Sequence, residues 1–225
     1  MRRQWIGCLI GLLSITTVSY TYSLVAATPE EMLRRPFACP DQPSVAAKNF
    51  QVLSVRKWEK GIVALYRGAC PTQEKRFANE PGTDKSVLSY RVVKRARAEW
   101  QAIGSGNHWS DESRSASELI DYGVGKTSEN ANQPSERRAA NQYAVFFGQV
   151  LSPTVSAIEV TFNNGKILRD STTDGLFLLV SSGATQVCDV RVLGADNQIL
   201  QRDEIDFPNS EAAQSDTCQP ISGRL

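Results

Sequence analysis

The sequence predicts a mainly β protein with a small α+β N-terminal lobe and an antiparallel β-sandwich in its C-terminal half. Three observations carry this prediction. Apolar and polar residues alternate over short stretches, Asn-Gly and Asp-Gly pairs separate some of these stretches, and the four cysteines that follow residue 27 fall two in each half. An apolar content of 41% excludes a wholly disordered chain, and 225 residues allow one large domain or two small ones.

The first 27 residues have the features of a secretory signal peptide of bacterial type. Arg2 and Arg3 precede an apolar run over 5–18, and Val25 and Ala27 stand at the small-residue positions that a signal peptidase recognises. We therefore expect cleavage after Ala27 and a periplasmic or secreted protein. The alternative is an anchor formed by an uncleaved N-terminal helix, because the uncharged stretch is long enough to cross a hydrocarbon core of about 30 Å.

The first lobe, residues 28–110, begins with helical signals and continues with strands. Pro29 and the acidic residues after it favour a short helix over 29–35, and a second helical turn is expected at 44–49. Residues 59–61 are suited to a tight turn between the first two strands. Four strand-like stretches are expected, at 50–55, 61–67, 86–93 and 98–103.

The last two of these stretches predict an antiparallel hairpin with an apolar inner face and a basic outer face. Even-numbered residues from Leu88 to Trp100 are mostly apolar, whereas three arginines have odd numbers. The candidate anion-binding face consists of Arg91, Lys94, Arg95 and Arg97. Lipid headgroups or polysaccharide would suit such a face and nucleic acid is not expected; the alternative is a solvated face that protects a sheet edge.

Net charge divides the chain into a basic and an acidic half. Residues 28–110 carry 14 Lys and Arg against 8 Asp and Glu, a net charge of +6, whereas residues 111–225 carry 9 against 16, a net charge of −7. Charges of opposite sign attract the two halves to each other. The basic half also has the sign required for weak contact with an anionic surface.

The segment 111–140 is interpreted as a polar linker or long loop between the lobes. Polar residues and glycine dominate it, and the few residues that offer apolar area to bury are Leu119, Ile120, Tyr122 and Val124. The segment has room for one short strand. The sequence leaves open whether it joins two domains or is a loop of one shared domain.

The second lobe, residues 141–225, carries the clearest strand pattern. Its turns are expected at 163–165, 174–175 and 194–197, where Asn, Asp and Gly gather. The expected strands lie at 143–151, 157–162, 166–169, 176–180, 186–193 and 198–205. Six or seven short strands at this spacing predict a small antiparallel sandwich followed by a C-terminal tail.

Four short motifs of this lobe invite comparison with known modules. They are Gly148-Gln149-Val150, the run from Ile158 to Phe162, Asn164-Gly165, and Thr173-Asp174-Gly175 with the run to Leu179. This part resembles Ig-like and prealbumin-like modules, including the carboxypeptidase regulatory-like family, and exported bacterial proteins in which such a module follows a small α+β lobe. The resemblance covers about 65 residues of turn and core signals. The resemblance therefore implies an Ig-like sandwich and gives little information about activity.

The cysteines are consistent with an oxidising compartment. Cys8 belongs to the signal segment, and an even number follows it: Cys39, Cys70, Cys188 and Cys218. Three pairings are possible, and we expect disulfides within each lobe, Cys39 with Cys70 and Cys188 with Cys218. For the second pair the alternative is a buried Cys188 thiol with Cys218 loose in the tail. No Cys-x-x-Cys spacing occurs, so we expect neither a metal nor another cofactor.

Ser105, His108 and Asp111 contain the residue types of a hydrolytic triad. In working triads these residues converge from separate elements beside an oxyanion hole, whereas here they lie within seven residues of one segment. A solvated histidine beside Trp109 is the simpler interpretation.

Gly125, Lys126 and Thr127 match the end of a phosphate-binding loop. That loop needs a glycine five residues before Gly125, where this chain has Ile120. A polar loop is therefore expected here.

Asp170, Thr172, Asp174 and Gly175 match the first half of a calcium loop. The twelfth position, which requires a bidentate glutamate, is Ser181. Turn formation accounts for these residues, and a weak cation site is the alternative.

These observations favour an exported envelope protein that acts as a non-catalytic binding or assembly module with an envelope or extracellular partner. The alternative is an exported hydrolase that uses His108 in a cleft between the lobes.

Overall fold

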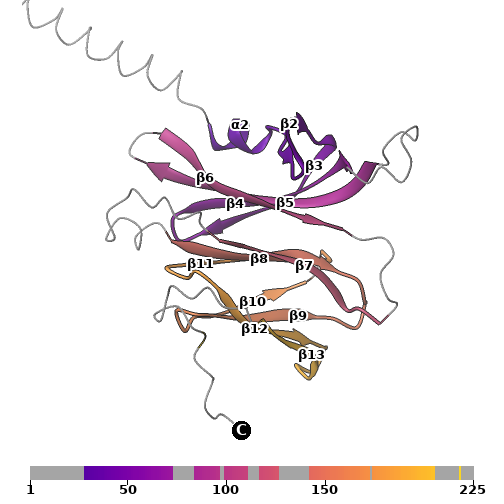
Figure 1. Cartoon of the computed structure of the whole chain (residues 1–225). Coiled ribbons are helices and arrows are strands. Elements are labelled where there is room, and N and C mark those ends of the chain that lie inside the picture. Colours follow the sequence, from indigo (N-terminus) through magenta and orange to yellow (C-terminus); the bar gives the residue numbers. More distant parts are fainter. Residues whose placement is uncertain are drawn as a thin grey trace, which may run out of the picture.

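The computed structural model describes residues 28–72, 84–96, 99–110, 117–126, 142–172, 174–205 and 218. The protein is mainly β, as predicted, and its sheets are stacked as layers (Figure 1). All strand pairs are antiparallel. We call the larger sheets sheet I (β3-β4-β5-β6), sheet II (β11-β8-β7) and sheet III (β10-β9-β12-β13).

A short helix and a small hairpin cover the outer face of sheet I. Helix α2 (Pro29–Leu33) begins with a capping box, in which Glu31 N donates to Thr28 Oγ1 and Thr28 N donates to the Glu31 carboxylate. The hairpin pairs β1 (Ala38–Cys39) with β2 (Gln42–Ala46). The second helical turn predicted at 44–49 is wrong, because pairing with β1 draws this segment into a strand.

Sheet I confirms the strands predicted for the first lobe and lengthens them. Its strands are β3 (Lys48–Trp58), β4 (Gly61–Pro71), β5 (Asp84–Ala96) and β6 (Glu99–Trp109). Trp58 pairs with Gly61 around the predicted turn. The prediction of one apolar and one basic face on β5 is wrong. Val87 and Val93 pack beneath α2 and the hairpin, and Leu88, Tyr90 and Val92 pack on the opposite face.

Sheet II lies between the other two sheets. Its strands are β7 (Ile120–Lys126), β8 (Tyr143–Val150) and β11 (Leu176–Ser182). Strand β7 occupies the segment interpreted as a linker and pairs with β8 along its whole length. All residues of β8 from Tyr143 to Gly148 are buried, because side chains on both faces of the strand are covered by neighbouring sheets.

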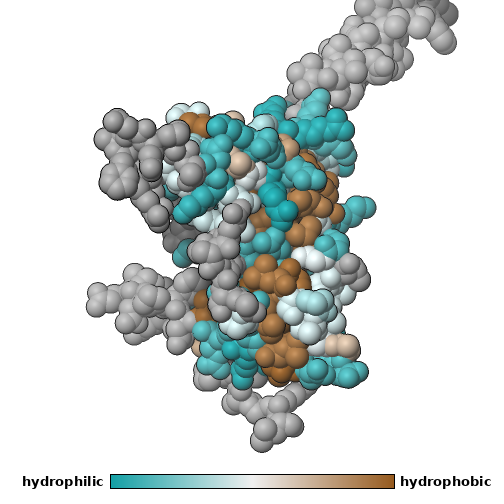
Figure 2. All heavy atoms as spheres, turned by 90° about the vertical axis from the view of Figure 1, so that its right-hand side faces the viewer, coloured by the Kyte–Doolittle hydropathy of each residue, from teal (hydrophilic) through white to brown (hydrophobic). Residues whose placement is uncertain are grey.

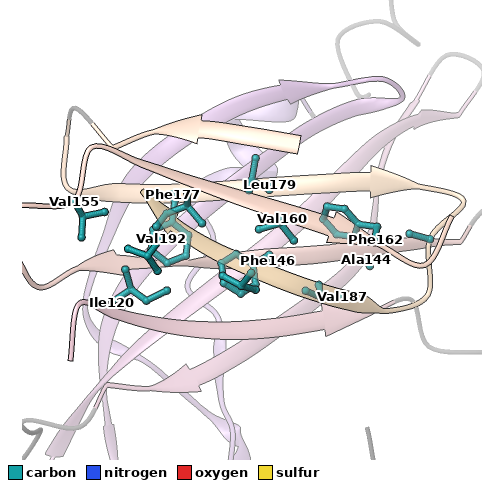
Figure 3. Packing of buried hydrophobic residues seen from close by; sticks show 13 residues of the cluster. Ile120, Ala144, Phe146, Val155, Val160, Phe162, Phe177, Leu179, Val187 and Val192 are labelled. Atoms are coloured by element: carbon teal, nitrogen blue, oxygen red, sulfur yellow. The ribbon is translucent and has the colours of Figure 1, made fainter. Parts of the chain in front are cut away.

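Sheets II and III form the sandwich. Sheet III contains β9 (Ala157–Phe162), β10 (Ile167–Ser171), β12 (Val187–Leu193) and β13 (Ile199–Glu204). Phe146 of β8 stacks on Phe177 of β11 at 5.3 Å, and valines of β9 and β12 close the core from the other side (Figure 3). Gly165 and Gly175 adopt positive φ at two of the predicted turns.

A second apolar layer joins sheet I to sheet II. The buried side chains of sheet I in this layer are Val63, Leu65, Leu88, Tyr90 and Val92, and those of sheet II are Tyr143, Val145, Phe147 and Leu178. Tyr90 and Phe147 lie at its centre with their ring centroids 5.0 Å apart. The sandwich therefore shares sheet II with the first lobe.

Both predicted disulfides are confirmed. Cys39 is bonded to Cys70 and Cys188 to Cys218, so each bond lies within one half of the chain. Among the residues that the structure describes, no helix has the length and apolar character needed to span a membrane.

Candidate functional site

A group of hydrogen-bonded polar side chains lies where β6 crosses β7. Its centre is Asp121 on β7, whose side chain is 0% exposed. His108 Nε2 lies 2.5 Å from Asp121 Oδ1, and Ser110 Oγ donates to Oδ2 at 3.0 Å. Gln149 Nε2 donates to the same Oδ2 at 3.2 Å. Because a carboxylate can only accept, the proton of the His108 bond belongs on Nε2.

This group, which we call the Asp121 cluster, extends to the surface through Arg67. The Arg67 guanidinium donates to Gln149 Oε1 at 2.7 Å, and Gln149 Nε2 also donates to Ser110 Oγ at 3.2 Å. Arg67 and His108 belong to sheet I, whereas Asp121 and Gln149 belong to sheet II. The cluster is thus a polar connection between the two sheets at the edge of their apolar layer.

The triad suggested by the sequence is not assembled. Ser105 pairs with Arg91 and His108 pairs with Leu88, and three positions along a strand place two side chains on opposite faces. Asp111 lies outside the described residues. The carboxylate that contacts His108 is Asp121, and it is the central member of the cluster, whereas a hydrolytic triad has histidine between serine and carboxylate.

Asp121 escaped the sequence analysis because it lies within the polar segment 111–140. A usable signal was the alternation there, since Ile120, Tyr122 and Val124 have one parity while Asp121 and two glycines have the other. The glycines of β7 permit its close approach to β5 and β6 of sheet I. A Cβ on Gly123 would lie 2.8 Å from His108 Cβ.

The three described residues of the predicted anion-binding face, Arg91, Lys94 and Arg95, do not share one surface. The Arg91 guanidinium donates to the carbonyls of Met32, Arg35 and Pro36 at the end of α2, and it lies 5.5 Å from the ring centroid of Tyr66. By the alternation of β5, Lys94 lies on the face opposite to Arg91 and Arg95. Arg95 is exposed, and Arg97 lies outside the described residues.

The calcium-like turn holds an internal cation. The Arg56 guanidinium on β3 forms an ion pair with the buried Asp170 and lies 3.8 Å from Asp174 Oδ2. Thr172 Oγ1 instead donates to the carbonyl of Val155. Gly125 and Lys126 belong to β7, and Thr127 lies outside the described residues, so the P-loop-like stretch begins as a strand. Within the described segments, no three His, Cys, Asp or Glu side chains gather as they would around a metal.

Three buried tyrosines have perturbed acidity. Burial raises the pKa of Tyr66 and of Tyr143 to about 12, with the Arg91 guanidinium opposing the rise at Tyr66. Burial also raises the pKa of Tyr90, and the nearby Tyr143 adds to this effect. These phenols therefore stay neutral at physiological pH.

Comparisons with protein-family models, with curated proteins and with solved structures find no match. The assignment of a β-sandwich therefore rests on the strand pairing and on the packing of the core.

Proposed function

We propose that this protein is an exported envelope protein that acts as a non-catalytic binding or assembly module. The supporting observation is that the acid and base groups of the Asp121 cluster are bonded to one another. Asp121 is buried and accepts hydrogen bonds from Ser110 and Gln149 in addition to its contact with His108. A carboxylate enclosed by its own chain stabilises the contact between two sheets and leaves little room for a substrate.

Two features support export. Disulfides such as Cys39–Cys70 and Cys188–Cys218 persist in oxidising compartments. The apolar N-terminal run with Arg2 and Arg3 before it has the character of a signal peptide. The sandwich is proposed to be of the Ig-like or prealbumin-like type, a kind of fold that serves many binding functions.

Exposed apolar side chains support a binding role. Five large ones lie on the surface of the described residues: Val52, Val55, Leu151, Ile167 and Ile199. Figure 2 shows apolar residues gathered on one face at the level of the sandwich, with further ones beside sheet I and hydrophilic residues around them. Surfaces of this kind are often contact sites for other proteins or for a membrane.

Export is tested by fractionation and by mass spectrometry of the recovered protein. We expect a mature N-terminus at Thr28 and recovery from the periplasmic or secreted fraction. Membrane-bound protein that retains residues 1–27 would instead establish the anchored form.

The binding role is tested by crosslinking in the native envelope, with His108→Asn and Arg95→Ala compared with the wild type. We expect the His108→Asn protein to capture the same partner, because the half-buried His108 side chain is bonded to the buried Asp121. Hydrolysis of esters, peptides or glycosides that is present in the wild type and lost in His108→Asn would establish the alternative hydrolase. A partner that is lost only on Arg95→Ala would identify an anionic surface as the target.

A further inference from the structure

The turn between β9 and β10 holds the only Asn-Gly pair of the sequence, Asn164 and Gly165. The two strands pair up to Thr161 and Ile167 on either side of it. Gly165 has a φ of 77°, and its N–H donates to the carbonyl of Phe162 at 2.9 Å. Both residues of the pair are exposed. Water therefore reaches the turn, while a hydrogen bond fixes its backbone.

The side-chain amide of Asn164 connects this turn of sheet III to the end of β11 in sheet II. Its Nδ2 group donates to the carbonyl of Ser182 at 2.9 Å and to Oγ of the buried Ser181 at 3.1 Å. Its Oδ1 accepts a hydrogen bond from Lys166 N at 3.1 Å. Both ends of the amide are thus bonded, and the side chain cannot rotate unless these bonds break.

Asparagine followed by glycine readily forms a cyclic imide, because glycine has no side chain to hinder the attack. The Gly165 nitrogen gives its proton to a base in solution and forms a bond to Asn164 Cγ. The bond from Cγ to Nδ2 breaks, and ammonia leaves. Water then opens the imide and leaves aspartate or isoaspartate at this position. The reaction consumes one water molecule and requires no other co-reactant.

In the folded protein both reacting groups are engaged elsewhere, the Gly165 N–H by Phe162 and the Asn164 amide by β11 and Lys166. We propose that Asn164 is a deamidation site that is latent in the folded chain and reacts when the β9–β10 turn opens. Deamidation removes the link to β11, because a carboxylate accepts hydrogen bonds but cannot donate one to the Ser182 carbonyl. Isoaspartate also lengthens the backbone of the turn.

The test is peptide mapping by mass spectrometry after incubation of the mature chain at mildly alkaline pH, in buffer and in guanidinium chloride that unfolds it. We expect Asn164 to react at least about tenfold more slowly in the folded protein, because only the opened fraction reacts. Asn197 is the internal control, since it is exposed in another turn but precedes glutamine, and it should stay unmodified in both solutions. Equal rates for Asn164 in both solutions, or no reaction in guanidinium chloride, would overturn the proposal.

Ser181→Ala tests whether the bonds to β11 keep the site latent. The variant removes the hydroxyl that contacts both ends of the Asn164 amide. Deamidation of the folded protein should become several-fold faster, and hydrogen exchange at the Gly165 amide, which reports opening of the turn, should rise with it. If the variant does not fold, low concentrations of guanidinium chloride should raise both rates together in the wild type. A folded variant that reacts no faster than the wild type would contradict the proposal, as would rates that do not rise together.

Asn164→Asp tests the consequence of the reaction for the sandwich. The variant has the side chain of one product and should lower the Tm by about 2 to 8 °C, because the donor to Ser182 is lost. The matched control is Asn197→Asp, which keeps the oxygen that accepts a hydrogen bond from Arg169 and should change the Tm by less. A Tm that is unchanged by Asn164→Asp would show that deamidation leaves the contact between the sheets intact.

Discussion

Charged and ionisable side chains, His108 among them, are used in this protein to hold its layers together. His108 and Asp121 connect β6 to β7, and Arg56 connects β3 to the β10–β11 turn. Arg91 of β5 donates hydrogen bonds to the backbone carbonyls at the end of α2. In each case the charged side chain reaches a partner on another element. A charge that is bound in this way contributes to the relative placement of layers, and its removal leaves a polar group buried without a partner.

The buried tyrosines make stability sensitive to alkaline pH. The pKa of Tyr66 and Tyr143 is about 12 in the folded protein, against about 10 in an unfolded chain. Their neutral forms favour the folded state, so this contribution is complete below pH ~10 and is lost as the pH rises towards ~12. Each residue contributes on the order of 2 kcal/mol to this loss. We expect the urea midpoint to fall steeply over this range, together with phenolate absorbance.

Tyr66→Phe provides a matched control for the pH effect. Tyr66 Oη is buried and has no hydrogen-bond partner among the described residues, so the variant should be as stable as the wild type at pH 7. It should lose less stability than the wild type above pH ~10. Equal losses in both proteins would show that Tyr66 does not titrate with unfolding.

At the scale of elements, the glycines of β6 and β7 permit strands to cross closely. A Cβ on Gly104 would lie 1.7 Å from Tyr143 Oη and 3.0 Å from its Cζ. Such a contact requires that the tyrosine or the strand shift. This half of β6 is not predictable from its sequence pattern, because Gly104, Ser105, Gly106 and Asn107 have the composition of a loop.

Gly104→Ala should destabilise the protein by about 1 to 3 kcal/mol through overpacking. The same substitution in a Tyr143→Phe background should cost clearly less, because the nearest atom is then absent. A double-mutant cycle by urea unfolding measures the difference. The control is Gly194→Ala, where the atoms nearest to a Cβ belong to the flexible Gln198 side chain, the first at 3.0 Å, and we expect a change within about 0.5 kcal/mol. A cycle without coupling would contradict the assigned crossing.

The disulfides differ in what they connect. Cys39–Cys70 lies in the buried layer beneath the hairpin, whereas Cys218 is partly exposed beyond the last strand. Chain entropy alone predicts about 3 to 4 kcal/mol for each, because the sequence separations are 31 and 30. We expect replacement of Cys39 and Cys70 by alanine to destabilise the protein more than replacement of the other pair, because it also disturbs packing. Urea unfolding of the two double variants measures this, and the reverse order would contradict it.

At the scale of the whole molecule, the alternation of the strands and the Asn-Gly and Asp-Gly turns within residues 141–207 predict that this part folds without the first lobe. The structure gives a reason to expect otherwise, since Tyr143, Val145, Phe147 and Leu178 are covered by sheet I. A fragment of residues 141–225 also lacks β7, the partner of β8. The two halves have opposite charges, but an apolar layer of this size holds them together with little dependence on salt.

We therefore expect the fragment 141–225 to self-associate or to give a poorly dispersed NMR spectrum, in contrast to the mature chain. A longer fragment, 117–225, restores β7 but still exposes the same apolar face. Replacing Val145 and Phe147 by threonine in that fragment should reduce its association in sedimentation experiments. A monomeric, well-dispersed 141–225 would show that the sandwich is an independent domain.

The sequence by itself determined the features that depend on neighbours along the chain. Alternation located most strands, Asn-Gly and Asp-Gly placed the turns at Gly165 and Gly175, and the placement of the cysteines favoured one disulfide in each half, although three pairings were possible. These signals are local, because strand period and turn geometry are set by adjacent residues.

Only the tertiary structure decided which strands are buried on both faces and which charges are internal. A strand such as β8 has the same local pattern whether one or two sheets cover it. The residues next to Arg56 and Asp121 in the sequence do not indicate which remote side chains will bind them. Burial of a second face depends on which remote strand packs there, and that is settled by the apolar area of the whole molecule.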